Sequence, residues 1–87
     1  APAVTTQSVL AGRVLYDKNG CAACHSIHGK GGKLGPELTR VGSKRSADWL
    51  LRHFKDPQAV SPGSIMPKTM LPDEQLKELT DYMMSLK

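Results

Sequence analysis

The stretch Cys21-Ala22-Ala23-Cys24-His25 contains both cysteines of the 87-residue chain, together with one of its three histidines. Ahead of this stretch, apolar residues at helical spacing predict a helix over about 8–17. That helix is expected to end at Asn19-Gly20, because both residues tolerate a left-handed conformation. Behind the stretch, the glycines over 29–35 are too frequent for regular structure. The two thiols and the imidazole are therefore expected in a short segment between a helix and a loop.

Cys-x-x-Cys followed directly by His is the attachment motif of a c-type haem. Two thiols on one turn can each add to a vinyl group on the same edge of a porphyrin. The adjacent histidine is then held on one face of the ring, where its imidazole can ligate the iron. The motif predicts one haem c attached through Cys21 and Cys24, with His25 as an iron ligand.

Three other chemistries use the same residue types. A thioredoxin-like redox pair belongs beside a βαβ pattern, and no strand is predicted here. A zinc site could take Cys21 and Cys24 with two of His25, His28 and His53, but adjacent ligands do not fit the usual paired spacing. A disulfide between the two cysteines would close only a tiny loop and stabilise little.

The length of the chain predicts one small domain over residues 1–87, with 1–7 as a loose N-terminal lead-in. A chain this short buries a small fraction of its surface, so domains of this size often depend on an additional stabilising group. A covalently bound haem, which is a large flat apolar body, would supply most of such a core.

The chain is basic: it has 12 Lys and Arg against 8 Asp and Glu, which gives a formal net charge of +4. The densest basic group is only Arg40, Lys44 and Arg45, whereas a nucleic-acid binder of this size more often has a dense basic stripe. No run of about 18 apolar residues is present, so no membrane span is expected. We interpret the charge as a solvated surface that does not bind nucleic acid and that favours protein partners with an acidic face.

The second half of the chain predicts two further helices. Ser46 is a good N-cap for a helix that Asp56-Pro57 ends. Prolines make residues 57–71 an extended loop, and an apolar stripe after Pro72 predicts a C-terminal helix. No segment alternates as a strand does. The predicted architecture is all-α, with three to four short helices and long loops wrapped around the haem.

With these elements in place, the chain resembles the class I mono-haem cytochromes c over nearly its whole length. The resemblance rests first on the attachment motif at 21–25. It rests also on the N-terminal helix, where Gly12 is followed one turn later by Tyr16, and on the C-terminal helix, where Leu79 and Tyr82 match the family's crossing partner. The resemblance implies the cytochrome c fold.

The resemblance also implies the ligand set. In the family, the carbonyl of a Gly-Pro proline accepts the N–H of the proximal histidine, and Pro36 stands at that place. Leu38 resembles the leucine that packs beside the haem. The segment 62–67 resembles the loop that carries the sixth ligand, which makes Met66 the expected ligand of the iron opposite His25, with Met70 as the alternative.

Four other residues bear on the expected site. Trp49 is expected either to donate its indole N–H to a haem propionate or to pack in the core. Arg40 is expected either to pair with a propionate or to lie in solvent. His28 follows His25 too closely to reach the other face of the ring, and His53 is expected at the surface of its helix.

The resemblance implies an electron carrier rather than an enzyme, because His and Met on both faces leave the iron no open position. Covalent attachment in this family implies a periplasmic or otherwise extracytoplasmic location. No oligomerisation signal stands out in the sequence, so we expect a monomer. Because the chain begins Ala1-Pro2-Ala3 without Met, we expect either that a secretory signal has been removed or that this is a soluble domain of a longer, membrane-anchored protein. Two alternatives remain open: a sensor or peroxidase with a labile Met ligand, and the domain through which electrons enter a larger oxidoreductase.

Overall fold

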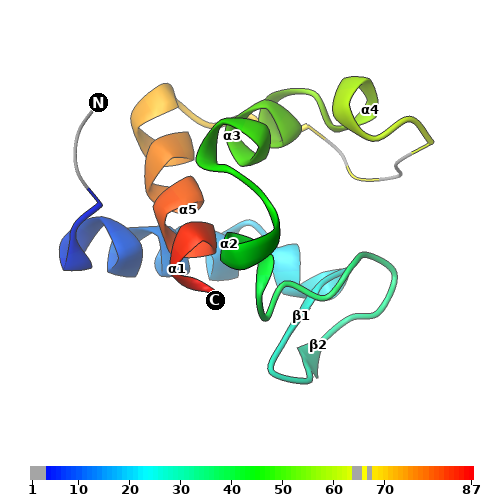
Figure 1. The fold of residues 1–87 in the computed structure, drawn as a ribbon, viewed down its shortest axis with the longest axis horizontal. Coiled ribbons are helices and arrows are strands. Elements are labelled where there is room, and N and C mark those ends of the chain that lie inside the picture. Colours follow the sequence, from blue (N-terminus) through cyan, green and yellow to red (C-terminus); the bar gives the residue numbers. More distant parts are fainter. Residues whose placement is uncertain (1–3, 64–65, 67) are drawn as a thin grey trace.

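The computed structural model describes residues 4–63, 66 and 68–87. These residues form a mostly helical domain, which confirms the predicted all-α class (Figure 1). Within the described residues, none of the helices has the length and apolar character that a membrane span requires. The elements in chain order are α1 (Thr6–Lys18), a 3-10 turn η1 (Cys21–Ala23), β1 (Ser26–Ile27), β2 (Lys30–Gly31), α2 (Val41–Lys44), α3 (Ala47–Lys55), α4 (Pro57–Val60) and α5 (Asp73–Ser85).

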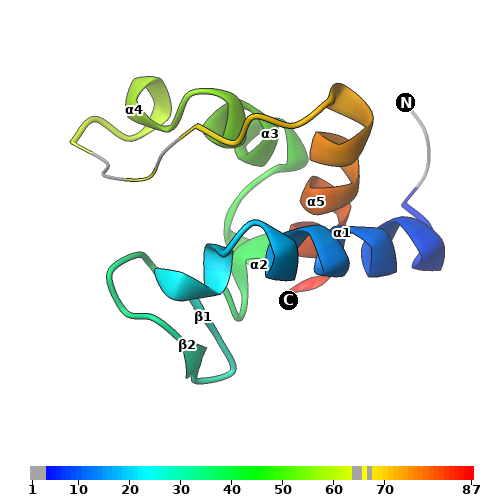
Figure 2. The same cartoon turned by 180° about the vertical axis from the view of Figure 1, so that it is seen from behind.

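The first and last helices, α1 and α5, cross each other and form the most extensive helix–helix contact (Figures 1 and 2). Gly12 lies buried at the crossing, and a Cβ atom there would collide with the backbone carbonyl oxygen of Glu78 and lie 2.7 Å from Cβ of Tyr82. The absence of a side chain at Gly12 therefore sets how closely the two backbones approach. This close approach explains a glycine in mid-helix, which costs about 1 kcal/mol relative to alanine.

Helix α1 begins at Thr6, two residues before the position at which the sequence pattern starts, because a capping box precedes it. Thr5 Oγ1 accepts the backbone N–H of Ser8 at 3.0 Å, and Ser8 Oγ accepts the backbone N–H of Thr5 at 3.0 Å. Of the expected lead-in over 1–7, residues 1–3 lie outside the described residues and the rest contains this cap and the first helical residues.

Besides the short helix α2, which the sequence analysis did not predict, two local elements differ from it. Ser26–Ile27 and Lys30–Gly31 pair as a short antiparallel hairpin, although the sequence pattern predicts no strand. Its two-residue turn is His28-Gly29, both at positive φ (51° and 79°), which is the geometry of a tight hairpin turn. The predicted extended loop also begins with a helix, α4. Asp56 caps it by accepting the N–H of Ala59, and Pro57 occupies the first helical position.

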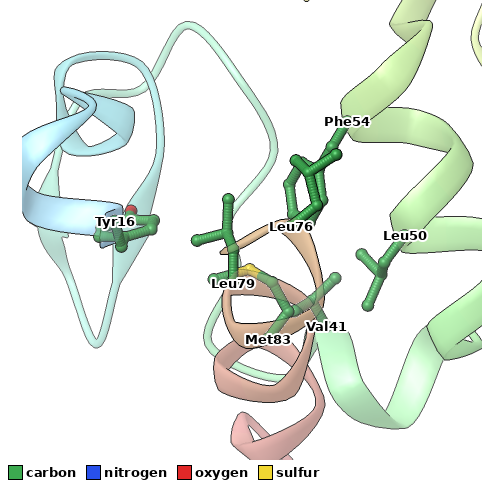
Figure 3. Close-up of a cluster of buried hydrophobic side chains, with 7 residues drawn as sticks. All are labelled: Tyr16, Val41, Leu50, Phe54, Leu76, Leu79 and Met83. Carbon is green, nitrogen blue, oxygen red and sulfur yellow. The ribbon is translucent and has the colours of Figure 1, made fainter. Parts of the chain in front are cut away.

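The hydrophobic core lies between α5 and the elements on either side of it. Figure 3 shows Leu79 and Met83 of α5 between Tyr16 of α1 and Leu50 of α3. The buried apolar residues of the described chain are Tyr16, Val41, Leu50, Phe54, Leu76, Leu79 and Met83. This cluster holds α3 in place against α5, and the predicted site residue Trp49 lies on α3.

Candidate functional site

A cavity of about 930 Å³ opens between the Cys21–His25 segment and a wall made by α3 together with residues 61–63, 66 and 68–70. The cavity is lined by seven of the eight residues that the sequence analysis placed at a haem site: Cys21, Cys24, His25, Pro36, Leu38, Trp49 and Met66.

The attachment segment is held in shape by backbone hydrogen bonds. Gly20 turns the chain out of α1 with a φ of 70°, and η1 then winds the segment so that the N–H of His25 donates to the carbonyl of Cys21 at 3.0 Å. The glycine-rich loop folds back over this turn: Gly32 N–H donates to the carbonyl of Ala22 at 2.8 Å and Gly35 N–H donates to that of Cys24 at 2.7 Å. The two thiols and the imidazole are therefore presented to one cavity by a turn and its covering loop.

The orientation of His25 is fixed by the residues after that loop. His25 Nδ1 lies 2.9 Å from the carbonyl oxygen of Pro36, so the ring N–H there is the donor and Nε2 is the nitrogen that remains to ligate a metal. A Cβ atom on Gly35 would lie 2.5 Å from Cε1 and 2.7 Å from Nδ1 of the imidazole. Gly35 thus gives the ring the space in which Pro36 orients it.

The cysteines do not behave as a redox pair or as a zinc site in this structure. Cys21 and Cys24 are free thiols, and burial raises the pKa of the Cys21 thiol, the opposite of the shift that a reactive thiolate requires. Across residues 4–63, 66 and 68–87, no three His, Cys, Asp or Glu side chains come together as a metal-binding group. The zinc site considered from the sequence is therefore not formed by these residues.

The far wall of the cavity carries both methionines considered as the sixth ligand. Met66 is half-buried and packs against the core cluster, whereas Met70 is 86% exposed, although both line the cavity. Three residues of the predicted ligand loop, at 64, 65 and 67, lie outside the described residues. Met83 is part of the buried core cluster. The contrast in burial between the two candidates favours Met66.

Arg40 is the predicted site residue that the structure does not bring to the cavity. Its side chain is exposed and is not among those that line the cavity, and Arg45, five residues later, lies there instead. His28 lies apart from the cavity, in the hairpin turn.

The prediction that His53 lies at the surface of its helix is wrong. His53 is half-buried and lines the cavity, with its ring stacked on Trp49 at 4.8 Å. The spacing of Trp49 and His53, four residues apart on the same helix, was the available signal, because residues at that spacing share one helix face.

The cavity and its residues fit a haem. The volume is within the range of ligand-binding cavities, about 300–1,000 Å³. The walls beyond the motif are mainly apolar, with Leu38, Val41, Leu50, Phe54 and Leu79 among the lining residues. Two free thiols, an oriented imidazole and a thioether face the same space, which is the donor set of a covalently attached haem with His and Met ligands. The fold and the site together define a protein of the covalent-haem class.

Comparison with known protein families matches residues 9–87 to the family described as Cytochrome c. The chain belongs to this family, and its chemistry is haem-based electron transfer.

Similar proteins include both small cytochromes and components of larger complexes. The chain is 36% identical over 93 residues to cytochrome c-551 of Stutzerimonas stutzeri, covering 98% of this chain and 88% of that protein. It is 27% identical over 84 residues to a nitric oxide reductase subunit of the same organism, covering 90% of this chain and 58% of that protein. It is 29% identical over 85 residues to cytochrome c oxidase subunit 2 of Alkalihalophilus pseudofirmus, covering 87% of this chain and 25% of that protein. The chain thus spans just over half of the reductase subunit and about a quarter of the oxidase subunit.

Proposed function

We propose that the protein is a one-electron carrier in which a haem c, attached through Cys21 and Cys24 and ligated by His25 and Met66, exchanges electrons with redox-partner proteins outside the cytoplasm. The observation that carries the proposal is the convergence of these four side chains on one cavity, with His25 oriented by Pro36. When bound, the haem supplies a one-electron ferric–ferrous couple.

The residues of the cavity explain why the proposed activity is electron transfer alone. His25 and Met66 would both ligate the iron and so leave it no position for a substrate. The apolar wall keeps water away, and a methionine ligand raises the reduction potential. Leu38 would pack against the ring, while Trp49 contributes either packing or an indole N–H to a propionate. The function proposed is therefore that of a carrier and not of an enzyme.

The mouth of the cavity supports a transient, charge-guided encounter with an acidic partner. Three cationic residues, Lys44, Arg45 and Lys68, line the cavity, against one anionic residue, Glu37. Exposed Leu34 (75%) and Met70 (86%) also line it and add apolar contact area. Positive charge around the exchanging edge speeds association with an acidic face, and small contacts allow rapid release.

The proposal includes a single domain over residues 1–87 that acts as a monomer in the periplasm or in another extracytoplasmic compartment. The support is the chemistry of attachment, because cytochromes of this family acquire their covalent haem outside the bacterial cytoplasm.

A second candidate is the domain through which electrons enter a larger oxidoreductase. The relatives favour it, since two of the named proteins are subunits of a nitric oxide reductase and of a cytochrome c oxidase and are longer than this chain. The chemistry at the haem would be the same, but the partner would be fixed rather than diffusing.

The test is the visible spectrum of the chain, produced in a host that attaches haem c, in its oxidised and reduced states. We expect low-spin bands in both states and the weak far-red ferric band of a sulfur–iron bond. Haem should stay with the chain on a denaturing gel, and the double variant Cys21→Ala, Cys24→Ala should lose it. A high-spin spectrum would instead favour a sensor or peroxidase with an open iron, and a colourless protein would contradict the haem assignment.

A further inference from the structure

Three side chains form a continuous stack along the cavity: Trp49 and His53 on α3, and Arg45 just before that helix begins. The guanidinium carbon of Arg45 lies 4.3 Å from the centre of the Trp49 ring, and the Trp49 and His53 rings are 4.8 Å apart and only 18° from parallel. The helix that carries Trp49 and His53 is capped by Ser46, whose Oγ accepts the backbone N–H of Trp49 at 3.1 Å. All three side chains line the main cavity. The stack therefore holds the His53 imidazole in a fixed position in the wall that would face the haem.

The surroundings of His53 disfavour its protonated form. Burial lowers the pKa of His53 below its usual value, and the charge of Arg45 lowers it further. The other charged groups that line the cavity come from three places: Glu37 beyond the attachment segment, Lys44 at the end of α2, and Lys68 before α5. Helix α5 contributes only the uncharged Leu79 and Met83. His53 thus lies in a cavity whose fixed charge is mainly positive.

We propose that His53 takes up one proton from solvent when the haem iron gains one electron, so that the Arg45–Trp49–His53 stack makes the reduction potential of the protein depend on pH. This inference rests on the proposed function. The electron comes from the redox partner, the proton binds an imidazole nitrogen of His53, and the charge of the cavity is unchanged overall. Reduction removes one positive charge that opposes protonation of His53, so the reduced state binds the proton more tightly.

The two companions of His53 have different roles in this coupling. Trp49 positions the imidazole through ring stacking, while Arg45 places a permanent positive charge at the other end of the stack. Removing the charge of Arg45 should raise the pKa of His53 in both oxidation states. The pH range over which the potential changes should then move upward.

The experiment measures the midpoint potential of the haem-loaded protein from about pH 5 to about pH 8, the range in which histidines titrate. We expect the potential to fall as pH rises through the two pKa values of His53. His53→Phe keeps an aromatic ring against Trp49 but cannot bind a proton, and it should remove this fall. Arg45→Gln should shift the fall to higher pH. The matched control is His28→Asn, because His28 lies in the hairpin turn outside the cavity and asparagine tolerates its positive φ.

A second measurement does not depend on a variant. The imidazole resonances of His53 in the wild-type protein, followed by NMR against pH, should give a higher pKa in the ferrous state than in the ferric state. Equal pKa values in the two states, or a His53→Phe curve identical to that of wild type, would overturn the inference. A protein that shows no reversible haem potential at all would contradict the proposed function instead.

Discussion

The Nδ1 atom of His25 lies 2.9 Å from the carbonyl oxygen of Pro36, with Gly35 directly against the imidazole ring. A bond of this kind fixes the tautomer and the orientation of a metal-ligating histidine and raises its basicity. The side chain of His25 is therefore positioned by three features that follow one another in the chain: the attachment motif, the glycine-rich loop and Pro36.

Gly35→Ala tests that relationship. The added Cβ would lie 2.5 Å from Cε1 of His25, so the ring must turn or the loop must move away from it. Loss of a supporting partner of this kind typically costs about 10–100-fold in metal affinity or activity. We expect a lower yield of haem-loaded protein, measured by absorbance per mole of chain, and a mixture of spin states. Gly63→Ala provides a control for backbone strain without a steric contact, because a Cβ there meets no atom within 4 Å and the φ of Gly63 is 86°, whereas that of Gly35 is not positive. A Gly35→Ala protein with the spectrum and yield of wild type would show that the contact is not needed.

The sixth ligand can be assigned with a matched pair of methionine variants. Met66→Ala should abolish the weak far-red ferric band, because Met66 is the half-buried candidate that packs against the core. Met70→Ala should leave the band in place, since Met70 is 86% exposed. The ferric absorption spectrum of each variant measures the outcome. The reverse pattern would assign the ligand to Met70.

Gly12→Ala tests the helix crossing. Alanine would gain about 1 kcal/mol in helix propensity, but its Cβ would collide with the backbone carbonyl of Glu78. Because that carbonyl belongs to the middle of α5, it cannot move aside as a flexible side chain would. Overpacking of this kind costs about 1–3 kcal/mol.

After the gain in helix propensity is subtracted, we expect a net loss of up to about 2 kcal/mol in the unfolding free energy, measured in a urea titration of the Gly12→Ala protein. Val14→Ala, at a position of the same helix that is 51% exposed, should change the unfolding free energy by less than about 0.5 kcal/mol. A Gly12→Ala protein as stable as wild type would mean that α1 and α5 can separate without cost.

Tyr16→Phe tests a buried hydroxyl. Tyr16 is 5% exposed, and its hydroxyl has no hydrogen-bond partner among the described residues. An unsatisfied buried polar group costs about 1–3 kcal/mol, so removing it should stabilise the protein near neutral pH. Urea unfolding at pH 7, compared with wild type, measures this gain. An unchanged or lower stability would mean that the hydroxyl has a partner in the haem-loaded protein.

The same hydroxyl gives the protein a pH dependence at the alkaline end. Burial is the largest of the causes that raise the pKa of Tyr16 from 10.0 to about 12. Because the folded pKa is above the unfolded one, ionisation of the hydroxyl favours the unfolded chain, and the unfolding free energy that is constant below about pH 10 falls as the pH rises to about 12. We expect the unfolding free energy of wild type to fall over that range and that of Tyr16→Phe to fall less. If the unfolding free energies of the two proteins fell equally with pH, that result would contradict a raised pKa of Tyr16.

Much of the site was predictable because its chemistry is local in sequence. The spacing of Cys21, Cys24 and His25 lies within a single turn, so the attachment geometry does not depend on distant residues. The helices were predictable for the same reason, since caps and apolar spacing act over a few residues. The hairpin was missed because its strands are two residues long and its turn, His28-Gly29, is a weak signal.

What the sequence alone determined is therefore the attachment motif and the helical class, both of which follow from short-range spacing. Only the tertiary structure decided which residues meet across the cavity. It brought His53 to the wall, because the direction in which α3 faces depends on its packing against α5. It also placed Arg45 at the cavity and left Arg40, at the start of α2, exposed. Local spacing specifies which side chains share a face, but burial against the rest of the chain decides what that face meets.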